Sequence, residues 1–172
     1  MNRKLLITVL LIFDTLSLSS QHDVVWTKEF HKHNIDYSQS GSSLIESHED
    51  DYFVVGRKEV SSDELDLVLL KLDNKGELIW QKSLGRTSRN VNINIIQTQD
   101  LNYLISHQAE FDPLIDQQKR IRIIKITPAG DIIWSFKFGG ISGNTFNIEI
   151  TNSVDGGYFV GASTNEIEGD IS

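Results

Sequence analysis

The sequence predicts an all-β fold built from repeated four-stranded antiparallel sheets of about 54 residues each. The three tryptophans are evenly spaced, since 80 − 26 = 54 and 134 − 80 = 54. Short runs rich in Ile, Val, Leu, Tyr and Phe alternate with turn residues, which is typical of strands. No segment beyond the N-terminus shows sustained helical periodicity. A fixed period near fifty residues with four strands per copy favours the blades of a β-propeller.

The residues around the tryptophans repeat as well. Two apolar residues precede each Trp, a large apolar residue follows four positions later, and a turn with a Tyr-led strand comes next. The repeated structural positions are Trp26, Trp80, Trp134, Tyr52, Tyr103 and Tyr158. The offsets from Trp to Tyr are 52 − 26 = 26, 103 − 80 = 23 and 158 − 134 = 24. The copies therefore differ mainly in loop length.

Connection lengths predict where each blade ends. The turns 73–76 and 127–130 are short and end in Gly, so each joins two antiparallel neighbours of one sheet, and the Trp strand is the last of its blade. Blade one is predicted over 43–84, with strands near 43–47, 52–57, 66–72 and 77–84. Blade two is predicted over 92–138, with strands near 92–98, 103–108, 121–127 and 131–138. The incomplete third blade, 146–172, has strands near 146–151 and 158–163.

Residues 23–30 form an orphan copy of the last strand. Propellers often close by letting one terminus complete the blade begun by the other, so we expect this strand to complete the C-terminal blade. Propellers typically have four to eight blades, whereas residues 21–172 encode under three. The expected fold is an open arc, belonging to a fragment of a longer protein. We expect Trp80 to be mostly buried and Trp26 to be more exposed, because its partner strand is missing.

The first twenty residues have the layout of a secretory signal peptide. A basic start precedes an apolar run over 5–13, and small residues surround a cleavage point near Ser20. An uncleaved N-terminal anchor is the alternative. Residues 21–172 then carry 14 basic and 23 acidic side chains, a net charge of −9, which disfavours a nucleic-acid partner. The chain has no Cys, which excludes thiolate metal sites. We expect a secreted or cell-surface protein with no transmembrane segment after cleavage.

Two resemblances support this interpretation. The segments 71–85, with Gly-Glu-Leu-Ile-Trp, and 153–161, with Asp-Gly-Gly-Tyr-Phe-Val-Gly, resemble the tryptophan-bearing propeller repeats of secreted Bacteroidetes proteins. Many of those proteins carry a C-terminal type IX secretion sorting domain, which is not present in these residues. The resemblance covers 23–172 and implies a fold and a compartment. The segment 130–140 is similar, more weakly, to quinoprotein-type propeller repeats, in which the repeated Trp and Gly lock adjacent blades and do not bind the quinone.

Three groups of residues invite a functional interpretation, and each has a structural alternative. The tryptophans could form a carbohydrate platform, although one Trp per repeat is what packing produces. His31, His33 and His48 could bind a metal, or lie on a solvated blade edge. The acidic loop with Glu166, Glu168 and Asp170, like the segment 61–66, offers oxygen ligands that Ca²⁺ prefers, but its spacing is not that of an EF-hand. The structural alternative is that these loops are exposed to solvent and bind no ion.

No catalytic constellation stands out, so the leading prediction is a non-enzymatic extracellular binding or scaffolding module with a protein or glycan partner. Loops on a rigid scaffold commonly carry such functions. The alternative is a fragment of a quinoprotein-type or polysaccharide-active propeller enzyme whose catalytic residues lie in missing blades. Because open strand edges invite pairing with other chains, we also expect this chain to self-associate.

Overall fold

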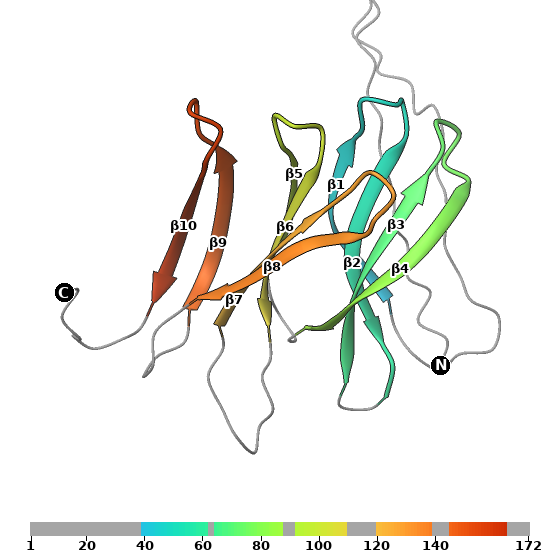
Figure 1. The fold of residues 1–172 in the computed structure, drawn as a ribbon. Coiled ribbons are helices and arrows are strands. Elements are labelled where there is room, and N and C mark those ends of the chain that lie inside the picture. The colour runs from blue at the N-terminus through green and yellow to red at the C-terminus, as the bar shows by residue number, and fades with distance from the viewer. Residues whose placement is uncertain (1–38, 62–63, 88–91, 110–119, 139–144, 165–172) are drawn as a thin grey trace, which may run out of the picture.

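The computed structural model describes residues 39–61, 64–87, 92–109, 120–138 and 145–164, and these residues form ten antiparallel strands and no helix. The strands make three sheets that stand side by side in chain order (Figure 1). Sheets 1 and 2 each have four strands in the order of the sequence, and sheet 3 has two. The prediction of an all-β fold with an open arc of propeller-type blades is confirmed.

The ten strands predicted between residues 43 and 163 are present, with bounds within four residues of those expected. Sheet 1 contains β1 (Gln39–Glu46), β2 (Tyr52–Glu59), β3 (Leu65–Leu72) and β4 (Leu78–Thr87). Sheet 2 contains β5 (Ile93–Gln97), β6 (Tyr103–Ala109), β7 (Arg120–Ile126) and β8 (Ile132–Phe138). Sheet 3 contains β9 (Thr145–Asn152) and β10 (Tyr158–Thr164). Trp80 and Trp134 lie on β4 and β8, the last strands of their sheets.

Five hairpin turns share one backbone geometry. In each, the N–H of the first residue donates to the carbonyl of the fifth, and the N–H of the fourth donates to the carbonyl of the first. The turns span residues 47–51, 73–77, 98–102, 127–131 and 153–157. The fourth residue always has a positive φ, which favours Gly. Gly occupies this position in three turns, but Asp50 and Leu101 occupy it in the other two, with φ of 60° and 61°.

Apolar side chains on both faces of the middle strands hold the sheets together. Between sheets 1 and 2 the core consists of Phe53, Val55, Leu67, Leu69, Leu84, Ile93, Ile95, Tyr103, Ile105, Ile124 and Ile126. Between sheets 2 and 3 it consists of Leu104, Ile121, Ile123, Ile148 and Ile150. Alternate residues of β6 therefore pack in opposite directions, which is why its sequence is apolar on both faces. Each fully buried side chain of this kind contributes about 1.5–3 kcal/mol.

The tryptophans contact the next sheet along the chain. Trp80 packs against the first core, with its ring centroid 5.8 Å from that of Phe53. Trp134 lies 6.5 Å from Tyr158 of sheet 3, and 37% of it is exposed. Most of the surface of Trp80 is covered, as expected, and a smaller part stays exposed because β4 is an edge strand. Trp26 and the whole segment 23–30 lie outside the described residues.

Candidate functional site

The first strands of the three sheets carry a row of polar side chains. Ser43 on β1, Asn94 on β5 and Glu149 on β9 occupy the same register position in their sheets, since each lies nine residues before the repeated Tyr (52 − 43, 103 − 94 and 158 − 149). Their Cα partners on the second strands are Val55, Ser106 and Gly161. The strands β1, β5 and β9 are neighbours at one edge of the arc. The repeat thus places three polar groups in a line across the sheets.

Weak hydrogen bonds connect this row. The Ser43 hydroxyl donates to Oδ1 of Asn94 over 3.4 Å, and Nδ2 of Asn94 donates to Oε2 of Glu149 over 3.5 Å. Both distances lie beyond the usual range for such bonds. Asn94 is partly buried and Glu149 is exposed. A ligand that offered shorter hydrogen bonds could therefore compete for these side chains at little cost.

The row lines an open hollow of about 620 Å³. Its walls are formed by Ser42, Ser43, Asn92, Ile93, Asn94, Ile148 and Glu149. The volume lies in the range of small-molecule sites. The polar lining consists of two hydroxyls, two carboxamides and one carboxylate, so it offers both donors and acceptors. Such a surface suits hydroxyl-rich ligands, and its lining residues include no nucleophile paired with a general base.

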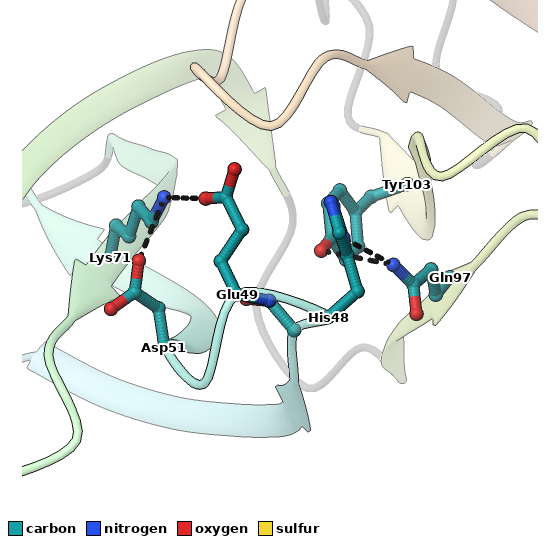
Figure 2. A network of polar contacts seen from close by, with 7 residues as sticks. His48, Glu49, Asp51, Lys71, Gln97 and Tyr103 are labelled. Carbon is teal, nitrogen blue, oxygen red and sulfur yellow. Dashed lines mark hydrogen bonds and ion pairs between the residues drawn. The ribbon is translucent and has the colours of Figure 1, made fainter.

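A second polar cluster lies at the turn end of sheet 1 (Figure 2). Nζ of Lys71 contacts carboxylate oxygens of Glu49 and Asp51, each at 2.9 Å. Burial alone would lower the pKa of Lys71, but the hydrogen bonds to the two carboxylates outweigh it and raise that pKa above its ordinary value. The hydrogen bond from Lys71 in turn lowers the pKa of Glu49. Lys71 and Glu49 are thus held in their charged forms.

The next sheet repeats this arrangement 54 residues later (125 − 71). Nζ of Lys125 lies 2.6 Å from Oδ2 of Asp100 and donates to the Tyr158 hydroxyl over 3.0 Å. The Lys125 hydrogen bond, followed by those from Thr98 and Asn102, holds the pKa of Asp100 far below its usual range. Lys125 connects sheet 2 to sheet 3, whereas Lys71 pairs with carboxylates of its own sheet, so we interpret both lysines as structural contacts rather than as binding groups.

His48 is engaged by the neighbouring sheet. Figure 2 shows Gln97 beside both His48 and Tyr103, and its Nε2 lies 2.9 Å from Nδ1 of His48 and 3.3 Å from the Tyr103 hydroxyl. His31 and His33, its suggested partners in a metal site, lie outside the described residues. In the described ranges no group of three His, Cys, Asp or Glu side chains is placed to hold a metal ion.

The predicted calcium loops are only partly described. Glu166, Glu168 and Asp170 lie outside the described residues, so that prediction stays open. In the segment 61–66, Glu64 pairs with Arg86, and Asp66 accepts a hydrogen bond from the Ser83 hydroxyl over 2.8 Å. These two carboxylates are therefore used within sheet 1.

Trp80 has a packing role. A Cβ added to Gly130 would lie 2.6 Å from Cη2 of its ring, so the turn of sheet 2 rests directly on the indole. Nζ of Lys82 lies 5.4 Å from the ring centroid and bonds the carbonyl of Ala129 and the carboxylate of Asp131 in the same turn. This contact supports the structural interpretation of the repeated Trp over a carbohydrate platform.

A buried histidine lies between sheets 1 and 2. His107 on β6 has 0% exposure, and its Nδ1 lies 3.2 Å from both the Thr87 hydroxyl and the Gln108 carbonyl. Nε2 has no hydrogen-bond partner among the residues that the structure describes. Burial, then the nearby charge of Arg122, lowers the pKa of His107 to about 4, although the Gln108 carbonyl acts in the opposite direction. The ring is therefore a neutral part of the core.

Sequence reasoning missed the polar row and the repeated lysine, although a signal for both was present. Aligning the copies on the repeated Tyr brings Ser43, Asn94 and Glu149 into one column, and aligning them on Trp brings Lys71 and Lys125 together. The Trp period indicates only packing positions. The row lies at a position where each copy has a different residue type, so no repeat of residue type reveals it.

Comparison with known proteins adds no family. No protein-family model matches this sequence, and no curated protein matches it. Among the described residues, no helix is long and apolar enough to cross a membrane.

Proposed function

We propose that this chain is a non-enzymatic extracellular binding module that takes a hydroxyl-rich ligand, a glycan, in the hollow along β1, β5 and β9. The observation that carries the proposal is the polar row Ser43, Asn94 and Glu149, which comes from three separate sheets and is joined only by long hydrogen bonds. These side chains are well suited to hydroxyl pairs, because a carboxamide both donates and accepts hydrogen bonds and a carboxylate accepts them over short, directional contacts.

The rigidity of the surrounding sheets supports this proposal. Two of the three polar side chains lie between residues anchored in a buried core, since Ile93 and Ile95 flank Asn94 and Ile148 and Ile150 flank Glu149. A pre-organised site loses less entropy on binding than a loop would. A concave polar hollow of this size also suits a saccharide better than a flat protein surface.

A glycan array tests the proposal directly. We expect purified chain to bind a limited set of glycans and expect Asn94→Ala and Glu149→Gln to lose that binding. The matched control is Asn74→Ala, which removes an exposed carboxamide from the turn between β3 and β4, far along the sheet from the row. Unchanged binding by both row variants would refute the hollow as the site, and capture of a protein ligand alone would refute the glycan.

The enzyme alternative is tested in parallel. Loading the chain with a quinone cofactor and assaying redox activity should give no turnover under the proposal. Bound quinone with sustained turnover, or cleavage of a bound polysaccharide, would replace the binding module by an enzyme.

The extracellular setting rests on the signal-like residues 1–20 and on the resemblance to secreted propeller proteins. Expression with the native N-terminus in a bacterial host, followed by mass measurement of the exported product, should show cleavage near Ser20. Retention of the full-length chain in the cytoplasm would contradict this setting.

A further inference from the structure

One face of sheet 1 is buried without a described strand against it. The side chains concerned are Tyr52, Val54, Val68, Leu70 and Leu72, which form a separate cluster and are 0–4% exposed. They alternate along β2 and β3 with the residues that pack on sheet 2, so they point the opposite way. Within the described ranges, the contacts of sheet 1 with other strands are with β5, β6 and β7 of sheet 2, which lies against its opposite face. Their cover must therefore come from elsewhere.

The contact between sheets 1 and 2 shows what such a cover looks like. There, the last strand of one sheet places Trp80 on Gly130 and Lys82 on Asp131 in the turn of the next sheet. The sequence separations are 130 − 80 = 50 and 131 − 82 = 49. The turn is held by Thr127 and has φ of 79° at Gly130.

The same separations link the N-terminal segment to sheet 1. Trp26 precedes Gly76 by 76 − 26 = 50 residues, and Lys28 precedes Glu77 by 77 − 28 = 49. Gly76 lies in a turn of the same hydrogen-bonding pattern, with φ of 76°. The residue types agree at all four positions: an indole, a lysine, a positive-φ glycine and a carboxylate.

The connecting lengths agree as well. Eight residues separate Leu84, the apolar residue four after Trp80, from β5 (93 − 84 − 1). Eight residues also separate Phe30, the corresponding residue after Trp26, from β1 (39 − 30 − 1). The link between the N-terminal segment and β1 is therefore as long as the link between Leu84 and β5. This length allows the segment to lie on sheet 1 as β4 lies on sheet 2.

We propose that residues 23–30 of the same chain cover this face of sheet 1, with Trp26 on the Gly76 turn and Lys28 paired with Glu77. The segment then takes the place that the last strand of a preceding blade would occupy. The contact between Trp134 and Tyr158 indicates the corresponding partner for Trp26, which is Tyr52, a member of the cluster. This face is consequently an internal interface and not a docking surface for other molecules.

Zero-length carbodiimide cross-linking of the purified chain, read by mass spectrometry, tests the pairing. The reagent joins an amine to a carboxylate only where the two are in contact, and Lys82 with Asp131, at 2.7 Å, is an internal standard. We expect a Lys28–Glu77 cross-link alongside the standard, and expect Lys28→Ala or Glu77→Gln to abolish it while the standard persists. A standard cross-link without the Lys28–Glu77 product would overturn the proposal.

Mixing isotopically heavy and light chains before cross-linking decides whether the cover comes from the same molecule. Products that are wholly heavy or wholly light support the proposal, whereas mixed products would show that a second copy supplies the strand. Trp26→Ala provides an independent measurement, because it should increase binding of a hydrophobic dye at the exposed cluster. Trp26→Phe, which keeps an aromatic ring, should change dye binding much less, and equal behaviour of the two variants would also count against the proposal.

Discussion

The indole of Trp80 rests on Gly130, so a methyl group at that glycine would come within 2.6 Å of Cη2. The two residues belong to adjacent sheets, and the absence of a side chain at Gly130 lets the turn of sheet 2 approach the ring. The packing of Trp80 on β4 therefore depends on a glycine at a turn position of the next sheet.

Gly130→Ala should be markedly destabilising. It places a Cβ at φ of 79° and also into the Trp80 ring, and overpacking of this kind costs about 1–3 kcal/mol. Gly156→Ala is the matched control, because Gly156 has φ of 86° but its nearest neighbour to an added Cβ is 4.0 Å away. Urea unfolding should show a greater loss of stability for Gly130→Ala than for Gly156→Ala. Equal losses of stability would mean that the Trp80 ring moves aside without a measurable cost.

Leu101→Gly should stabilise the protein by roughly 0.5–1 kcal/mol. Leu101 has φ of 61°, a conformation that costs an L-residue about 1–2 kcal/mol, and half of its side chain is exposed. Part of this gain is offset by the greater freedom of Gly in the unfolded chain. Val154→Gly, in the fully exposed second position of another turn with no positive φ, should give no gain. Thermal unfolding would check both, and a lower melting temperature for Leu101→Gly would contradict the prediction.

Stability should fall as the pH drops from about 6.5 to about 4 because of His107. Above this window the ring is neutral in both states, and within it the unfolded state takes up a proton that the buried ring resists. Protonation would put an N–H at the unpartnered Nε2 and a charge near Arg122. A shift from 6.5 to about 4 corresponds to roughly 3 kcal/mol lost below the window.

Urea unfolding as a function of pH measures this loss as a difference between variants. His107→Gln should flatten the acid limb of the stability curve relative to the wild-type curve. Identical curves for wild type and His107→Gln would show that the buried ring is not responsible.

Features that repeat in residue type could be predicted from the sequence, and features whose residue types differ between copies could not. Trp80 and Trp134 predicted the last strands correctly, because one ring per 54 residues needs one packing position per sheet. The turns at Asp50 and Leu101 carried no Gly signal, so their positive φ values could not be predicted from local preferences. The row of Ser43, Asn94 and Glu149 was hidden because three different residue types share one register position. The burial of most of Trp80 was predicted, and the part that stays exposed follows from the edge position of β4, which is a tertiary property.

Self-association should depend on the outward face of sheet 3. Tyr158 and Val160 pack on sheet 2, so the alternating residue Phe159 points away, and it is 66% exposed. In the described residues β10 pairs only with β9. The outer edge of β10 therefore has no described partner strand, and the exposed Phe159 lies on the same strand. Such edges associate readily, and an added charge blocks them. Light scattering after size exclusion should show concentration-dependent oligomers that Phe159→Lys reduces. Val154→Lys, which adds the same charge at an exposed turn, should leave them unchanged, and a wild-type chain that stays monomeric at every concentration would show that this face is already covered.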